Sequence, residues 1–171
     1  MTRAERAPMG APPGTPSPAI VALMIGELDD MPTLNRISAL IVERAVSLWR
    51  DAPGSVLVCE SAPMAVEAIR LGMAPSDVTT ALPQPLGHTT RLVALWLARS
   101  PHGRGPVRLV THALHARRAI GIFRKVGIQA TATGLDLTFD REDPDWKLRS
   151  VGAFRVYNAA AHIYGLCRGW V

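Results

Sequence analysis

The sequence predicts an α/β fold of three layers, in which a mostly parallel sheet of about five strands is covered by helices on both faces. Two observations support this prediction. Short apolar runs recur along the chain, and each is followed by a longer segment with the 3.6-residue periodicity of a helix. Strict alternation of strands and helices requires right-handed crossovers, which place helices on both sides of a parallel sheet. The arrangement is Rossmann-like, and in such folds a ligand binds at the carboxyl ends of the strands.

The chain has 171 residues, enough for one domain with a sizeable core. Its first 18 residues contain five prolines and two glycines, which prevents a regular element there. We therefore expect residues 1–18 to be a disordered lead and residues 19–171 to form a single α/β domain.

The first part of the domain contains two strand–helix units. The runs AIVALMI at 19–25 and SVLVC at 55–59 are continuous apolar segments, typical of buried parallel strands. Between them, 34–50 carries apolar residues at helical spacing on one face. The segment 61–71 is expected to be a helix, because Ser61 is a good N-cap and a proline stands just inside it.

A third strand–helix unit follows in the middle of the chain. We expect a short strand at 77–82 and a helix at 87–100, with Leu92, Leu95 and Trp96 facing inward. Prolines on both sides of the turn after this helix separate it from the next strand.

The last part of the domain contains two further strands, at 107–111 and 128–133. Between them, a helix at 112–126 is ended by a glycine. A polar connection at 136–145 then leads to an apolar closing helix at 150–167.

Composition and charge limit the classes of partner. The formal net charge of +5 favours an anionic partner, but the basic residues are scattered, so we expect a small anionic ligand and no specific nucleic acid. The two cysteines, Cys59 and Cys167, match no metal-binding spacing and are typical of a reducing compartment. No apolar run reaches the roughly 20 residues of a transmembrane segment, and the N-terminus has no secretory signal. We therefore expect a cytoplasmic protein.

The strongest candidate site is the strand-to-helix passage around Thr111. His115 and Arg118 are three residues apart, so they share a face of the following helix. Arginine grips phosphate or carboxylate groups, and histidine donates, accepts or transfers a proton near neutral pH. The alternative is a solvated basic helix, because His112 and Arg117 stand in the same segment.

The segment VTHALHARRA, with the sequence around Thr89, resembles a motif of the YdcF/SanA/ElyC family, a large bacterial family. The family pattern is Val-Thr-Ser, two variable residues, His, two variable residues and Arg-Ala. The sequence matches it at Val110, Thr111, His115, Arg118 and Ala119, while His112 replaces the serine. Upstream, Thr89 matches the end of the family's Ser-x-Asn-Thr element, and His88 replaces its asparagine.

Other family features are missing, which puts the family's ligand in doubt. The glycine-rich turn after the first strand is replaced by Gly26-Glu27-Leu28-Asp29-Asp30, and the Ser-Gly-Gly after the second strand by Cys59-Glu60-Ser61. The side chains that replace these glycines crowd the place where a ligand would approach the backbone. Asn158 stands where the family's last helix often has a glutamate. The resemblance implies S-adenosylmethionine as a candidate ligand and a role in envelope physiology.

Further candidates lie at the same predicted edge of the sheet. Glu60 is a candidate hydrogen-bond acceptor or base, and Cys59 a candidate nucleophile, with a buried apolar thiol as the alternative. The acidic loop with Asp29 is a candidate for a ribose or a divalent cation, or is simply exposed, and Gly26 is its tight turn. Thr89 is either an N-cap or a donor to the anion.

These observations lead to three functional hypotheses. The first is a domain that binds a small anionic, nucleotide-like or phosphorylated ligand. The second is an enzyme of specialised metabolism, a hydrolase or transferase, with His115, Arg118 and Glu60 as catalytic residues. The third is a non-catalytic interaction protein that keeps only the fold, in which the apolar closing helix would serve a homodimer or another partner. In the first two, the ligand-binding set is Thr111, His112, Thr89, His88, Gly26, Asp29 and Cys59; no residue is assigned to a metal.

Overall fold

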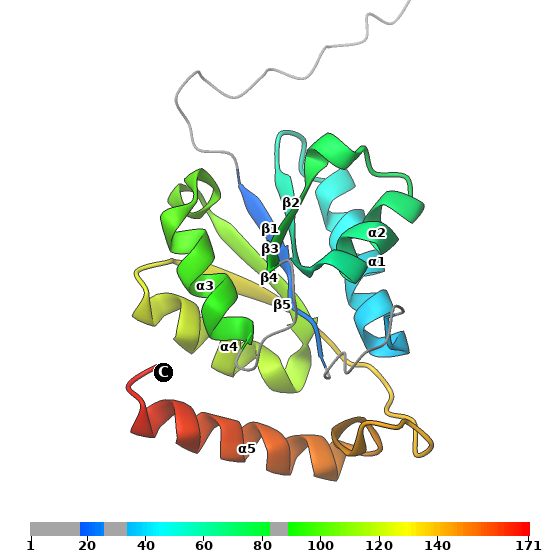
Figure 1. Cartoon of the computed structure of the whole chain (residues 1–171), viewed down its shortest axis with the longest axis vertical. Coiled ribbons are helices and arrows are strands. Elements are labelled where there is room, and N and C mark those ends of the chain that lie inside the picture. Colours follow the sequence, from blue (N-terminus) through cyan, green and yellow to red (C-terminus); the bar gives the residue numbers. More distant parts are fainter. Residues whose placement is uncertain (1–17, 26–33, 83–88) are drawn as a thin grey trace, which may run out of the picture.

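The computed structural model describes residues 18–25, 34–82 and 89–171. Its centre is a single sheet of five parallel strands in the order β3-β2-β1-β4-β5 (Figure 1). The strands are β1 (Ala19–Ala22), β2 (Val56–Ser61), β3 (Val78–Leu82), β4 (Val107–His112) and β5 (Ala130–Leu135). The α/β prediction is confirmed, and the sheet is parallel throughout.

The described residues form five α-helices, four of which cover the faces of the sheet. They are α1 (Arg36–Arg50), α2 (Ala62–Arg70), α3 (Thr89–Arg99), α4 (Ala113–Lys125) and α5 (Val151–Cys167). Three short 3₁₀ turns, η1 (Pro75–Asp77), η2 (Pro101–Arg104) and η3 (Trp146–Leu148), lie between them. No described helix is long and apolar enough to cross a membrane.

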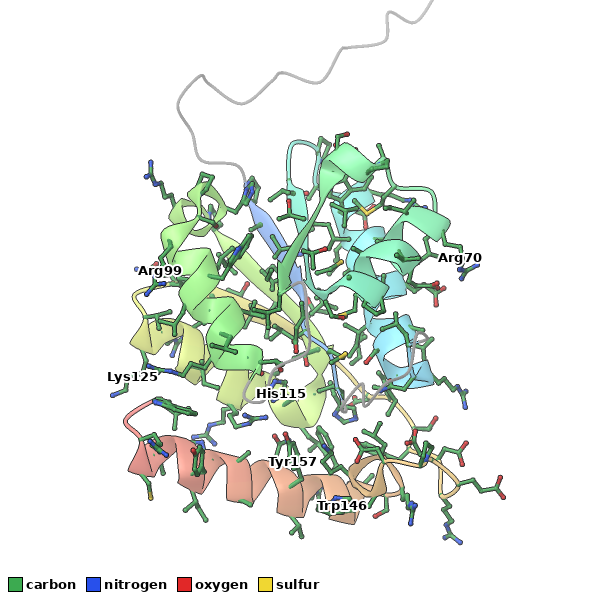
Figure 2. The ribbon with its side chains drawn as sticks, in the orientation of Figure 1. Arg70, Arg99, His115, Lys125, Trp146 and Tyr157 are labelled. Carbon is green, nitrogen blue, oxygen red and sulfur yellow. The ribbon has the colours of Figure 1, made fainter. Side chains whose placement is uncertain are left out.

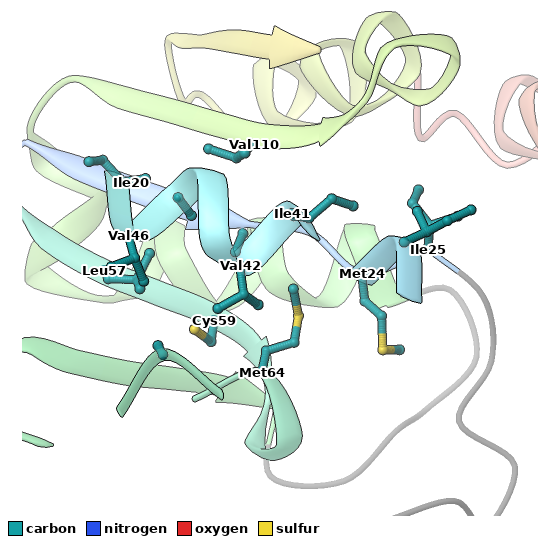
Figure 3. Close-up of a cluster of buried hydrophobic side chains, with 14 of the residues drawn as sticks. Ile20, Met24, Ile25, Ile41, Val42, Val46, Leu57, Cys59, Met64 and Val110 are labelled. Atoms are coloured by element: carbon teal, nitrogen blue, oxygen red, sulfur yellow. The ribbon is translucent and has the colours of Figure 1, made fainter. Parts of the chain in front are cut away.

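The sheet has an apolar core on each face. The sheet and the helices that cover its two faces are the three predicted layers. On one face, α1 and α2 pack on alternate strand residues such as Ile20 and Leu57 (Figure 3). On the other face, α3 and α4 pack on the intervening residues, such as Val21 and Val58. Because strand side chains alternate between faces, each core takes every second residue of the same strands.

The closing helix α5 belongs to neither layer. It runs past the edge of the sheet at which the strands end, and it packs against α4 (Figure 1). Phe154 at its first turns is buried against the rings of His112 and Phe139, and Val171 lies against Gly165 and Gly121 at its other end. Both ends of α5 are thus fixed to the body of the domain.

The local signals explain most of the boundaries. Asn35 and Ser150 cap α1 and α5 through their side chains, and Gly72 and Gly127 adopt the positive φ expected after a helix. The first strand is shorter than expected. Its regular pairing with the neighbouring strands ends at Ala22, although the next three residues are also buried.

The predicted inner face of α3 is only partly right, because Leu92 and Trp96 pack at the margin of the core and Leu95 is not part of it. Leu92, Leu95 and Trp96 are half-buried, while Val93 and Leu97 are fully buried against the sheet. The predicted disordered lead, apart from its last residue, lies outside the described residues.

Candidate functional site

The sheet contains one topological switch point, between β1 and β4. The chain moves outward from β1 through β2 to β3, and then crosses to β4 on the other side of β1. In parallel α/β sheets the carboxyl ends of the strands at such a point form the usual ligand site. The candidate residues must therefore be judged by whether they meet at this edge.

Glu60 and Thr111 do meet there. Ala22 on β1 is in register with Cys59 on β2 and with Val110 on β4, so the next residues along, Glu60 and Thr111, lie on either side of Leu23. Both belong to the alternating set that faces α3 and α4. Neighbouring strands are about 4.8 Å apart, so these two backbone positions are roughly 10 Å from each other.

His115 approaches the same place from α4. It lies on the inward face of the helix with Ala119 and Ile122, and it is 2% exposed (Figure 2). Its Nε2 is 3.3 Å from the hydroxyl of Thr90, a buried residue in the first turn of α3. The two helices that cover this face are therefore joined by a polar contact directly at the candidate site.

Arg118 is held by the closing helix. Its Nε donates a 3.1 Å hydrogen bond to Oδ1 of Asn158, whose Nδ2 donates to the carbonyl of Leu114 at 2.9 Å. The neighbouring Tyr157 also acts on Arg118, because its phenol partly offsets the fall in the pKa of Arg118 that burial causes. Tyr157 stands on the side of α5 that faces the sheet (Figure 2).

Burial and charge set the protonation states. Burial raises the pKa of Glu60 to about 7, although the Thr89 hydroxyl, the Met24 N–H and the Arg118 charge each lower it in part. Burial, followed by the Arg118 charge, lowers the pKa of His115 well below its usual value. Near neutral pH the site therefore contains a neutral imidazole, a guanidinium and a carboxyl group that can gain or lose a proton.

Three polar atoms at this edge lack a hydrogen-bond partner. They are Oε1 of Glu60, Oγ1 of Thr111 and Nδ1 of His115, all fully buried and unpaired within the described part of the chain. Asn158 lies beside His115, but its amide is already engaged with Leu114 and Arg118. A buried unsatisfied polar atom costs about 1–3 kcal/mol, so three together require an explanation. Hydrogen bonds to a bound ligand would provide one.

His112 has a structural role. Its Nδ1 accepts the Leu114 N–H at 3.1 Å and so caps α4, and its Nε2 is 3.3 Å from the Leu137 carbonyl. Its ring packs against Phe139 and Phe154, which also contact each other. Both nitrogens are in use and the ring lies on the opposite face of the sheet from Thr111, which argues against the predicted role of His112 in ligand binding.

Cys59 also points away from the site. Its side chain is fully buried in the core formed with Val42 and Met64 (Figure 3). Burial raises the pKa of the thiol to about 12, so it is protonated and unreactive at neutral pH. This placement favours the alternative of a buried apolar cysteine over a nucleophile or a ligand-binding residue.

The remaining candidates divide into described and undescribed residues. Thr89, in the first turn of α3, hydrogen-bonds the Glu60 carboxyl and lowers its pKa. The predicted roles of Gly26, Asp29 and His88, and of the acidic loop around Asp29, fall on positions outside the described residues. Within the ranges that the structure does describe, no group of three or more His, Cys, Asp or Glu side chains is arranged to hold a metal ion.

Sequence reasoning did not place three contributors in the site: Thr90, Tyr157 and Asn158. Thr90 and His115 are 25 residues apart, and Arg118 and Asn158 are 40 apart. For Asn158 the sequence did carry a signal, because it stands where the last helix of the family that the sequence resembles often has a glutamate.

The chemistry of this arrangement is that of a polar, partly charged binding site. The charged group is Arg118, and the neutral donors and acceptors are Thr111, His115 and the protonated form of Glu60. Such a set suits a ligand with one anionic group and several hydroxyl or amino groups. Comparison with models of known families, with curated proteins and with solved structures finds no match for this chain.

Proposed function

We propose that this chain is a YdcF-like domain that binds a small anionic ligand, nucleotide-like or phosphorylated, at the carboxyl edge of its sheet. The observation that carries the proposal is a set of three buried polar atoms, on Glu60, Thr111 and His115, that have no hydrogen-bond partner among the described residues, with the Arg118 charge acting on Glu60 and His115. A site that evolved only for stability would not combine three such groups, because each one weakens the free protein.

The hydrogen bonding of Arg118 favours an anionic ligand over a neutral one. Its hydrogen bond to Asn158 uses Nε, so Asn158 orients the guanidinium from behind. The terminal nitrogens, one side of which meets the hydrogen-bonding phenol of Tyr157, are the part of arginine that binds a carboxylate or phosphate. S-adenosylmethionine, the candidate from the family resemblance, has a carboxylate for Arg118 and ribose hydroxyls for Glu60 or Thr111. A role in envelope physiology is part of the proposal on that resemblance alone.

A cytoplasmic setting also belongs to the proposal. Both cysteines are free thiols, and one of them, Cys167, is exposed. An exposed free thiol is more compatible with a reducing compartment than with an oxidising one.

An enzymatic role is the second candidate, and one observation favours it. The Glu60 carboxyl has a pKa of about 7, the value at which a general acid or base works best near neutral pH. The pKa of His115 is too low for that role, so this candidate assigns proton transfer to Glu60 and hydrogen bonding to His115. Arg118 then stabilises developing negative charge.

The test is a ligand screen by thermal shift with inorganic phosphate, S-adenosylmethionine, nucleotides and sugar phosphates. We expect at least one of them to stabilise the wild type and to lose its effect in Arg118→Ala. The matched control is Arg124→Ala, because Arg124 is an exposed arginine on the same helix. Stabilisation that survives Arg118→Ala, or no stabilisation by any of these probes, contradicts the proposal. Turnover of a stabilising ligand that disappears in Glu60→Gln while binding is kept favours the enzyme.

A further inference from the structure

Charge is distributed unevenly along the chain. Residues 78–135, which run from β3 to β5, contain eight arginine or lysine side chains and no aspartate or glutamate. The remaining residues contain eleven basic and fourteen acidic side chains, so the net positive charge of the chain comes entirely from this segment. Protein surfaces normally mix charges of both signs, because like charges repel one another in the folded state.

The fold gathers much of this charge on one face of the domain. Helices α3 and α4 cover the same face of the sheet, and η2 packs against α3. These three elements carry five exposed cations, which we call the basic face: Arg99, Arg104, Arg117, Arg124 and Lys125. None of the five has a carboxylate partner among the described residues. Arg99 and Lys125 project from the same side of the molecule (Figure 2).

The helix dipoles do not explain the whole basic face. Positive charge is favoured in the last turn of a helix, which accounts for Arg99, Arg124 and Lys125. Arg117 is in the second turn of α4, where the dipole does not favour a cation, and Arg104 lies outside both helices. These two arginines therefore point to a partner outside the chain.

The spacing of the cations favours a partner with repeated negative charges. Arg117 and Arg124 are seven residues apart, so they lie on one line along α4, about 10 Å from each other. A single small anion cannot contact both of them and also Arg99 on the neighbouring helix. The phosphates of a nucleic acid recur every few ångström along its backbone. Four of the five cations are arginines, whose planar guanidinium binds phosphate with two parallel bonds.

The apolar side chains distinguish a nucleic acid from a membrane as the partner. Among the described residues, the large apolar side chains that are exposed belong to α2, η3 and α5, and none belongs to α3, η2 or α4. Helices that bind a bilayer insert such side chains into it. A face with cations and without exposed large apolar groups suits a hydrated polyanion.

We infer that the basic face binds the phosphodiester backbone of a nucleic acid. Contacts with the backbone carry no sequence information, so this binding does not depend on base sequence. The isoelectric point of about 10 is typical of domains that bind nucleic acids. The inference does not rest on the ligand proposed above, because Arg118 is not one of the five cations.

The first test measures the affinity of the full chain for nucleic acids of mixed sequence by fluorescence anisotropy. The probes are single strands and duplexes of RNA and of DNA, and their relative affinities show which form the face prefers. We expect binding to at least one of them at low salt. Contact with five phosphates should weaken this binding roughly a hundredfold between about 50 and about 200 mM salt.

The second test compares two double variants with the same net charge. Arg117→Glu/Arg124→Glu reverses two cations of the basic face and should weaken binding at least about tenfold. The matched control is Arg44→Glu/Arg108→Glu. Arg44 is exposed on α1, which covers the other face of the sheet, and Arg108 alternates with Val107 and so points to that face as well. The control should bind within about threefold of the wild type, and circular dichroism should show that both variants are folded.

Lys125 allows a third test that needs no variant. The chain has two lysines, of which Lys125 is exposed and Lys147 is 5% exposed. Acetylation by an activated ester should modify Lys125 in the free protein and much less in the complex with nucleic acid. Mass spectrometry measures both sites, and the low modification of Lys147 should be the same in the two states.

Four results would overturn the inference. The first is no binding to any of the four nucleic acids at about 50 mM salt. The second is equal weakening by the two double variants, because net charge alone would then explain the binding. The third is acetylation of Lys125 at an unchanged rate in the complex. The fourth is binding to vesicles of anionic phosphatidylglycerol without binding to nucleic acid, which would assign the face to a membrane surface.

Discussion

Arg118 on α4 and Asn158 on α5 are joined by a 3.1 Å hydrogen bond, although 40 residues separate them in the chain. Through its amide nitrogen Asn158 also bonds the carbonyl of Leu114, one turn earlier on α4. The closing helix therefore does more than cover the edge of the sheet, because it sets the direction of the only described guanidinium that acts on Glu60.

Asn158→Ala should lower the free energy of unfolding by about 1–2 kcal/mol, because it removes two hydrogen bonds from a partly buried site. Urea denaturation measures this change. His162→Ala, at an exposed position on the same helix, is the control and should change stability by less than about 0.5 kcal/mol. Equal stability of the two variants would show that Asn158 does not tie α5 to α4.

Thr111→Val should stabilise the protein in the absence of ligand by about 1 kcal/mol. Valine keeps the shape of threonine and removes a buried hydroxyl that has no partner among the described residues. The same variant should bind more weakly any ligand found in the thermal-shift screen. A clear loss of stability in urea denaturation would mean that the hydroxyl is satisfied in the free protein.

Glu60 should make stability depend on pH. Its folded pKa of about 7 lies above the usual 4.5, so its contribution is complete below about pH 4.5 and is lost as the pH rises through 7. The loss is roughly 3 kcal/mol at most. Glu60→Gln should remove this dependence, so the stability difference between variant and wild type should grow in favour of the variant from about pH 5 to about pH 8. A constant difference across this range would contradict the raised pKa.

Thr90 and His115 should be energetically coupled. Thr90→Val leaves both ring nitrogens of His115 without a partner among the described residues, which should cost about 1–3 kcal/mol. Adding His115→Leu removes the unpaired imidazole, so the double variant should be less destabilised than the sum of the two single variants. Strict additivity in this double-mutant cycle would mean that the 3.3 Å contact carries no energy.

Gly134→Ala should destabilise the start of α4. A Cβ at Gly134 would lie 2.9 Å from the Cα of Ala113, so backbone must move, at a cost of about 1–3 kcal/mol. Gly121→Ala is the control, because its Cβ would meet only Val171 at 3.9 Å and alanine favours the helix. Thermal unfolding should rank Gly121→Ala at or above the wild type and Gly134→Ala below it.

Many of the helices and strands could be predicted, because local sequence patterns determine them. Apolar runs indicated the strands, and the glycines at 72 and 127 mark the ends of α2 and α4. The inner face of α3 could not be predicted, because leucine and tryptophan occur on two sides of that helix and only the sheet decides which side is buried.

The candidate site was predictable only in part. The positions of Thr111, His115 and Arg118 follow from a strand that passes into a helix, and the topology brings Glu60 to the same edge. The partners Thr90 and Asn158 depend on how α3 and α5 pack, which the sequence pattern does not encode locally. His112 looked like a ligand residue because capping of a helix by an imidazole is uncommon compared with capping by serine or aspartate.

The alternation of Cys59 and Glu60 on β2 has a consequence for folding. A slip of this strand by one residue would move the carboxyl group in among Ile41 and Met64 and turn the thiol toward Arg118. An acid among aliphatic side chains is far more expensive than a misplaced valine or cysteine, so mispaired forms of the sheet are penalised strongly. The burial of Glu60, which lowers stability above its raised pKa, therefore also disfavours the one-residue slip of β2.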